Sequence, residues 1–105
     1  MMQIAARTNG EPIVCEFDTV FSTYRFSFVS LNIRETTIKM QSIRYLIADD
    51  KAFMIVFGLD VSSDKLTTIP VMMDALDAMQ AIASMSREFI EITEVDSMHY
   101  LRGDD

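Results

Sequence analysis

The pair Asn9-Gly10, set between two segments of alternating apolar and polar residues, constrains the fold of this 105-residue chain more than any other local feature. A two-residue type I′ turn needs positive φ at both central positions, which Asn-Gly readily adopts. Pairing Thr8 with Glu11 then gathers apolar side chains on one face, because side chains alternate along a strand. These residues are Met2, Ile4, Ala6, Ile13, Cys15 and Phe17. We predict an N-terminal β-hairpin, with Pro12 at the start or edge of its second strand.

The following segment, residues 20–48, is rich in β-branched and aromatic residues, but its alternation changes phase twice. One change lies near Phe28-Val29 and the other between Met40 and Ile43. A bulge or bend explains each change, so we expect a strongly curled sheet. Turns are predicted at residues 18–19, 49–51 and 58–65. Residues 52–59 are apolar on both faces, as is typical of a central strand covered on both sides.

Between Pro70 and Met85, apolar residues recur at helical spacing around more than one side of the segment. A helix packed on a sheet needs an apolar band of about 100°, and this segment exceeds that width. We therefore predict a long helix, capped by Thr68, whose surplus apolar face mediates self-association. The predicted contact residues are Val71, Met72, Met73, Leu76, Met79, Ile82 and Ala83.

A last strand is expected over residues 89–95. The predicted class is α+β: a curled, mostly antiparallel sheet of about five to seven strands packed on one long helix in the C-terminal half. Such a roll or partial barrel is pleckstrin-like by architectural analogy only, and the analogy carries no function. Residues 1–96 are expected to form a single domain and residues 97–105 a flexible tail.

Composition and charge restrict the function classes. The net charge of −7 argues against direct nucleic-acid binding, which needs a basic surface. No apolar run reaches the roughly 18–20 residues needed to span a membrane, and no signal peptide is evident. A single cysteine is compatible with a reducing compartment. We expect a cytoplasmic protein without a membrane role.

The charge is unevenly distributed, since residues 19–48 hold four basic residues against one acid, a net of +3. One interpretation is a set of solvated strand faces with basic residues at the edges. The other is a face that binds a small anion or a nucleotide, because arginine matches phosphate geometry. The candidate anion-binding residues are Arg25, Ser27, Thr37, Lys39 and Arg44.

Groups capable of chemistry are few and scattered. His99 is the only histidine and lies in the expected tail, while Cys15 alternates with core residues. Residues 60–64 resemble a calcium loop but lack its central glycine and terminal glutamate. Asp74 and Asp77 are spaced as acidic residues on an exposed helix face commonly are. The tripeptide at residues 102–104 matches the integrin-recognition motif, but a match of three residues often occurs by chance. We predict no catalytic residues, no metal site and no cofactor.

These observations favour a small, acidic, non-enzymatic interaction protein that self-associates, with a dimer as the expected state, and binds another macromolecule, with a protein as the expected partner. Viral and mobile-element inhibitors of host machinery are one class of such proteins. Anion or nucleotide binding by the basic sheet face is the first alternative. The second is a DNA mimic, built from dispersed acids that occupy a basic groove. Those acids are Asp49, Asp50, Asp60, Asp64, Asp74, Asp77, Glu88, Glu91, Glu94 and Asp96.

Overall fold

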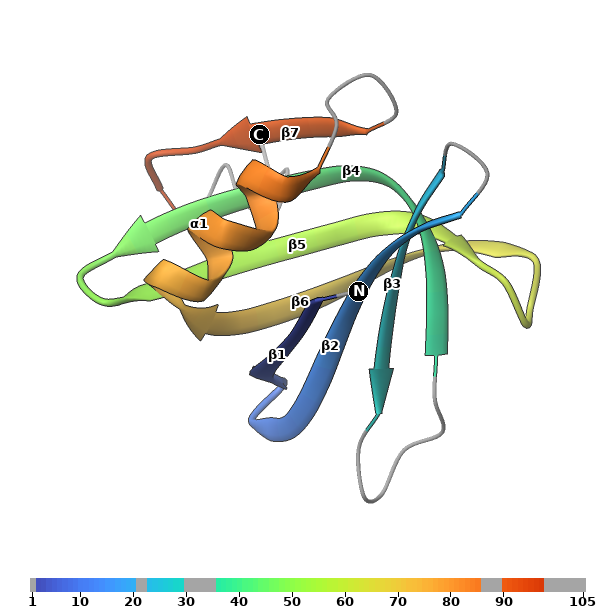
Figure 1. Ribbon diagram of the computed structural model, residues 1–105, viewed down its shortest axis with the longest axis horizontal. Coiled ribbons are helices and arrows are strands. Elements are labelled where there is room, and N and C mark those ends of the chain that lie inside the picture. Colours follow the sequence, from blue (N-terminus) through green and yellow to red (C-terminus); the bar gives the residue numbers. More distant parts are fainter. Residues whose placement is uncertain (1, 21–22, 30–35, 86–89, 98–105) are drawn as a thin grey trace.

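The computed structural model describes residues 2–20, 23–29, 36–85 and 90–97. These residues form strands and one helix, so the predicted α+β class is confirmed (Figure 1). In chain order the elements are β1 (Met2–Thr8), β2 (Glu11–Val20), β3 (Thr23–Val29), β4 (Thr36–Ala48), β5 (Lys51–Asp60), β6 (Lys65–Asp74), α1 (Ala75–Ser84) and β7 (Glu91–Glu94).

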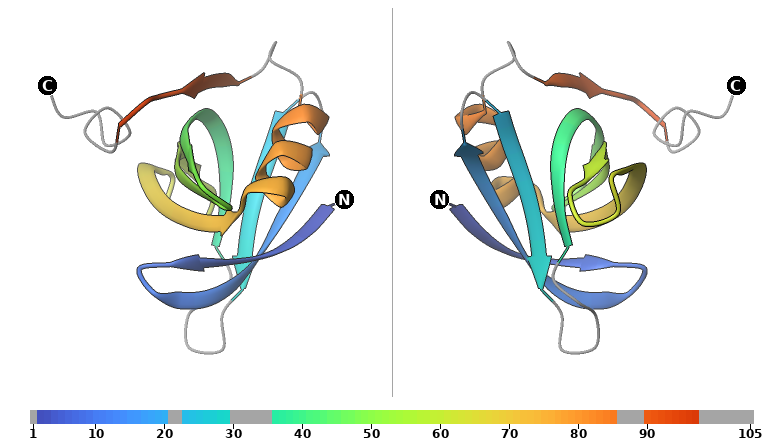
Figure 2. Two further views of the ribbon diagram at one scale, coloured as in Figure 1. Left: turned by 90° about the vertical axis from the view of Figure 1, so that its left-hand side faces the viewer. Right: turned by 90° about the vertical axis from the view of Figure 1, so that its right-hand side faces the viewer.

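All strands belong to one coiled sheet in the order β3-β2-β1-β6-β5-β4-β7 (Figure 2). Strands β1 to β6 pair antiparallel with their neighbours, and β7 joins β4 in parallel. Strand β3 also pairs with the first part of β4, which brings the sheet round on itself. The sheet stays open along most of the β1–β6 junction, because the described pairing there consists of Arg7 with Met72 alone.

The N-terminal hairpin has the predicted register, from Met2 opposite Phe17 to Thr8 opposite Glu11. Asn9 and Gly10 have φ of 49° and 83°, as a type I′ turn requires. Pro12 precedes the β2–β3 ladder, which begins at Val14, so its missing N–H interrupts no pair in that ladder. The predicted turn at residues 18–19 is wrong, because β2 continues through both residues and pairs them with residues 25 and 24.

The second phase change corresponds to a β-bulge, since the β4–β5 register shifts between Met40 and Ser42. The bulge allows Met40 and Ile43 both to point into the core. Across the ladder, Gly58 lies so close to β4 that an added Cβ would stand 2.1 Å from the carbonyl oxygen of Lys39. At the first predicted phase change, the β2–β3 register runs without a shift up to residue 29. Residues 30–33 lie outside the described part of the chain.

The helix is shorter than predicted and begins later. Residues 65–74 form β6, which pairs with β5 along its whole length, and the helix occupies only the ten residues Ala75–Ser84. The buried residues Ile69, Val71 and Met73 alternate along β6 at the strand period of two. Asp74, and not Thr68, is the residue before the helix. No helix in the described residues is long and apolar enough to cross a membrane.

Helix α1 covers the inner face of the coiled sheet. Its buried residues, Ala78, Ala81 and Ile82, belong to the same core cluster as Met54 of β5 and Val71 of β6. The predicted last strand is present as β7, although the described strand is confined to residues 91–94. Residues 86–89 and 98–105 lie outside the described part of the chain. The flexible tail expected over residues 97–105 therefore stays a prediction.

The close approach at Gly58 predicts that Gly58→Ala destabilises the fold strongly. Because the contact is with backbone, relief requires β4 and β5 to separate, and we expect a loss of about 3 kcal/mol in the free energy of unfolding. Gly10→Ala is the matched control, since it meets no atom within 4 Å and only forces alanine to a φ of 83°. That variant should lose about 1 kcal/mol. Urea denaturation of both variants tests the order, and equal losses would contradict the role given to Gly58.

Candidate functional site

The residues predicted to mediate self-association do not share one surface. Val71, Met73 and Ile82 lie in the core, and Met72 is half-buried on β6. The side of α1 turned away from the core presents Leu76, Met79 and Ala83, with Leu76 75% and Met79 55% exposed. The long helical stripe expected from the sequence is therefore divided between a buried strand and one exposed helix side.

Four of the five candidate anion-binding residues come together on β3 and β4. Residue 25 is opposite Lys39 and also opposite Asp18, while Ser27 is opposite Thr37. The Ser27 and Thr37 hydroxyl oxygens lie 3.0 Å apart and form a hydrogen bond with each other. Arg44 lies beyond the bulge in β4, beside a different surface hollow. Because the two hydroxyls bond mutually, the structure adds no specific observation in favour of an anion site.

Five of the ten acidic residues listed for a DNA mimic are divided between the two ends of β5, while Asp77 lies in α1 and Glu91, Glu94 and Asp96 lie in or just after β7. Asp49 and Asp50 lie in the turn before β5, and Asp74 is close to them, because Lys51 Nζ is 2.6 Å from its Oδ1. This hydrogen bond, followed by the attraction of its charge, raises the pKa of Lys51. Asp60 and Asp64 lie at the other end of this ten-residue strand, about 30 Å away when followed along the strand at 3.3 Å per residue. Residue 88 is outside the described part.

The segment resembling a calcium loop is a self-contained turn. The N–H and the hydroxyl of Ser62 both donate to Asp60 Oδ1, each at 2.9 Å. The hydroxyl bond first, and then the N–H bond, lowers the pKa of Asp60. The Asp64 N–H closes the turn on the Asp60 carbonyl at 2.8 Å. The Asp60 carboxylate thus stabilises the turn, as Asx turns commonly do.

Cys15 occupies the predicted core position and has no exposed surface. Burial raises the pKa of its thiol to about 12, which suppresses the reactive thiolate. His99 and residues 102–104 lie outside the described part of the chain. Within the described residues, no group of three His, Cys, Asp or Glu side chains is placed to hold a metal ion.

The outer face of β4, β5 and β6 carries an extensive apolar surface. Cross-strand pairing places Phe53 between Leu46 and Met72, and Ile55 beside Pro70. Side chains of paired residues lie on the same face of a sheet. We define the outer apolar face as Leu46, Phe53, Ile55, Phe57, Leu59, Leu66, Pro70 and Met72. Leu66 is 60% exposed and the others are half-buried, whereas α1 packs on the opposite face.

A hollow of about 340 Å³ lies on this outer face. Ile55 and Phe57 are among its apolar lining residues, and Arg44 of β4 and Glu91 of β7 bring charges of opposite sign. The sequence indicated the second apolar face of β5. The sequence predicted that other elements cover both faces of β5. In the structure α1 covers the inner face of β5, and the outer face is partly exposed.

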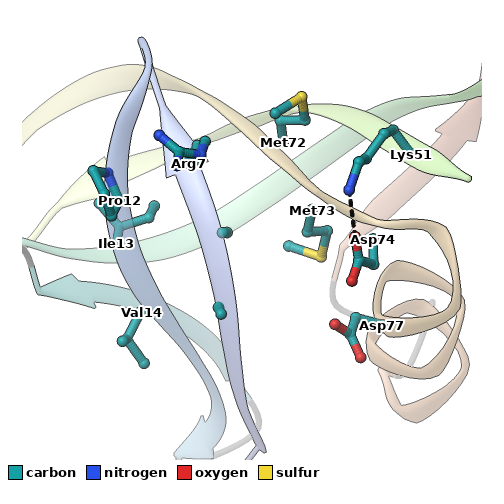
Figure 3. Close-up of a pocket in the computed structure, with 11 residues that line it drawn as sticks. Arg7, Pro12, Ile13, Val14, Lys51, Met72, Met73, Asp74 and Asp77 are labelled. Atoms are coloured by element: carbon teal, nitrogen blue, oxygen red, sulfur yellow. Dashed lines mark hydrogen bonds and ion pairs between the residues drawn. The ribbon is translucent and has the colours of Figure 1, made fainter.

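A larger groove of about 650 Å³ lies between the N-terminal hairpin and the junction of β6 with α1 (Figure 3). Arg7 and Pro12 stand on the hairpin side, and Met73, Asp74 and Asp77 stand on the other. The side chains of Met73 and Asp77 point toward the space between the hairpin and the β6–α1 junction. Sequence reasoning missed this groove, because it depends on the point at which β1 and β6 separate.

Comparison of the chain with protein-family models, curated proteins and solved structures gives no match. The two surfaces must therefore be interpreted from their own residues. The outer apolar face is broad and lined by several strands, which suits a large flat partner. The groove is narrow and bordered by a strand edge, which suits an extended one.

The buried thiol of Cys15 predicts a specific alkaline weakness. The unfolded chain has a thiol of ordinary pKa, near 9.0, and the folded chain one of about 12. Between these two pH values the thiol of the unfolded chain loses its proton, whereas the thiol of the folded chain keeps it. The contribution of the protonated thiol to the free energy of unfolding is therefore complete below pH 9.0, falls by about 1.4 kcal/mol per pH unit above it, and is lost by about pH 12.

Chemical denaturation at several alkaline pH values tests this expectation, with Cys15→Ala as the control. The variant retains every lysine and tyrosine but lacks the thiol, so its stability should fall less steeply with pH. Identical slopes for the two proteins would contradict the assignment.

Proposed function

We propose that the protein is a small, non-catalytic, cytoplasmic interaction protein that forms a homodimer through the outer apolar face and binds a further protein. The partly exposed apolar residues on β4, β5 and β6 are the observation that supports this proposal. Its pleckstrin-like architecture remains a proposal by analogy and adds nothing to the functional argument.

The composition of the outer apolar face supports an interface. Phe53, Ile55 and Phe57 form a row along β5. Phe53 has the apolar cross-strand neighbours Leu46 and Met72, and Ile55 has Pro70, whereas Phe57 lies between Ser42 and Thr68. Contiguous apolar surfaces rimmed by polar residues are typical of interaction sites. Aromatic side chains buried at the centre of an interface contribute strongly to the binding free energy once water is excluded. Ser42, Thr68 and Thr93 provide polar neighbours around the hollow.

Charge favours a second copy of the chain as the occupant. The protein carries a net charge of −7, so most of its surface repels another copy. The outer face differs because Arg44 and Glu91 line the same hollow and Lys39 is opposite Leu59. A twofold axis that passes between Arg44 and Glu91 brings Arg44 of one copy toward Glu91 of the other, because both copies present the same surface. This part of the face therefore offers a charge pairing to a second copy of the chain.

Light scattering coupled to chromatography tests the dimer. The wild type should have twice the chain mass of 12.0 kDa. Ile55→Glu places a carboxylate at the centre of the interface and should weaken the dimer by at least about tenfold, since burial of an unpaired charge costs more than 1.4 kcal/mol. Leu66→Glu is a second variant on the same face and should weaken the dimer in the same way. It is expected to fold even where Ile55→Glu does not, because Leu66 is already 60% exposed.

Met79→Glu is the matched control. Met79 is 55% exposed on α1, away from the outer apolar face, so its substitution should leave the mass unchanged. Loss of the dimer in this variant alone would move the interface to the helix. A wild type that is monomeric even near 1 mM, which corresponds to about −4 kcal/mol, would reject self-association.

A further inference from the structure

The groove beside β1 contains a strand edge that the sheet does not use. The described pairing between β1 and β6 consists of Arg7 with Met72. On the side of this pair nearer the hairpin turn, the Thr8 hydroxyl donates to the Pro70 carbonyl at 2.6 Å. The contact between β1 and β6 ends there, because Thr8 is the last residue of β1. On the other side, the same register would set Asp74 opposite residue 5, but the chain enters α1 at Ala75.

The hairpin geometry shows which amide groups face the groove. In a two-residue hairpin the residues flanking the turn, here Thr8 and Glu11, exchange backbone hydrogen bonds. Even-numbered residues of β1 therefore bond to β2, and the amides of Gln3, Ala5 and Arg7 point the other way. Arg7 uses this side to pair with Met72. Gln3 and Ala5 each keep an N–H and a carbonyl on this edge of β1, and no described strand is paired with them there. Ala5 lines the groove, and Gln3 continues the same edge beyond the lining residues.

The side chains around this edge leave the backbone accessible. Ala5 is exposed and carries only a methyl group, while the Gln3 amide donates to Glu16 at 3.1 Å, across the hairpin. Arg7 donates to the Gly10 carbonyl at 2.8 Å, within its own turn. On the opposite side the groove is lined by Met72, which is half-buried, and by Met73, which is 3% exposed and belongs to the core.

Four charged residues line the groove, and the two basic ones, Arg7 and Lys51, are already bonded to the Gly10 carbonyl and to Asp74. Asp74 and Asp77 both line the groove, and Asp77 points into it (Figure 3). Asp74 is paired with Lys51 at 2.6 Å. A cation that enters the groove therefore meets the carboxylate of Asp77 without displacing the Lys51–Asp74 pair.

We propose that the groove binds an extended peptide segment of a partner protein, which adds as a strand along Gln3 and Ala5 and places a lysine or arginine against Asp77. Strand addition supplies affinity through main-chain hydrogen bonds, and the wall residues supply specificity. This inference rests on the proposed interaction function and gives the chemistry of its partner: a basic residue flanked by small or β-branched apolar residues.

Selection from a phage-displayed library of random linear peptides tests this chemistry, with the full chain as bait. We expect enrichment of peptides with a basic residue between apolar ones. A synthetic peptide of the enriched sequence should shift the amide NMR signals of Gln3 and Ala5 and slow their hydrogen exchange. The same peptide methylated on its backbone nitrogens should bind at least about tenfold more weakly, because it cannot form the ladder.

Two variants test the two walls separately. Ala5→Pro removes the N–H that faces the groove without removing a β1–β2 bond, and should lower affinity at least about tenfold. Asp77→Asn should lower it by about tenfold through loss of the charged hydrogen bond. Asp64→Asn is the control, since it removes one acid at the far end of β6 at a positive φ of 58° that asparagine tolerates.

Three results would overturn the inference: no enrichment of basic sequences, equal binding by the Ala5→Pro and Asp77→Asn variants, or slow exchange of Gln3 and Ala5 in the free protein. The last would mean that a segment of this chain or a second copy already fills the groove. The dimer is judged independently by mass. A monomer that binds the peptide rejects only the dimer, and a dimer that does not bind rejects only the groove.

Discussion

The bend in β4 is the constraint on which the rest of the structure depends. Gln41 is the extra residue between Met40 and Ser42, and Gly58 on β5 gives the Lys39 carbonyl room to approach. The first part of β4 then pairs with β3 and the later part with β7, while β5 accompanies both. Without the bulge, apolar residues on one side of Gln41 would point outward, since a shift of one residue exchanges the two faces of a strand.

A sheet coiled in this way needs only a small element to cover its interior. Helix α1 meets the need with ten residues, and two of its three buried side chains are alanines, Ala78 and Ala81. Small side chains let the helix axis lie close to the strands. The inner face of β5 is thereby buried, whereas its outer face, with Phe53, Ile55 and Phe57, has no comparable cover from α1. Apolar surface thus remains on the sheet as well as on α1, where Leu76 is 75% exposed.

The same junction creates the groove. Where β6 ends at Asp74, the strand that would have continued beside β1 becomes a helix, and the edge of β1 at Gln3 and Ala5 is released. Edges of this kind are usually blocked by charge, proline or cover, because they invite pairing with another chain. Here Arg7 and Lys51 line the groove together with Asp74 and Asp77, and because Lys51 pairs with Asp74, the carboxylate of Asp77 is the charge proposed to attract a basic segment.

Features governed by neighbouring residues were readable from the sequence. Asn9-Gly10 determined the turn, and the turn determined the hairpin register, because each pair follows from the one before it. The phase change between Met40 and Ile43 located the bulge, and alternation placed Cys15 in the core. The outer face of β5 was visible as a pattern, although its cover was misjudged.

Residues 70–74 show what the pattern could not decide. Apolar runs such as Val71-Met72-Met73 satisfy both the helical and the strand period, so the choice depends on which partner is present. The ladder with β5 supplies backbone hydrogen bonds along all of β6 and buries Val71 and Met73 on one side, which a helix there would forgo. The sequence by itself determined the hairpin, the bulge and the alternating core, because their causes are local. Only the tertiary structure decided where strand becomes helix, and with it the outer apolar face and the groove, because that boundary follows from pairing between residues distant in the chain.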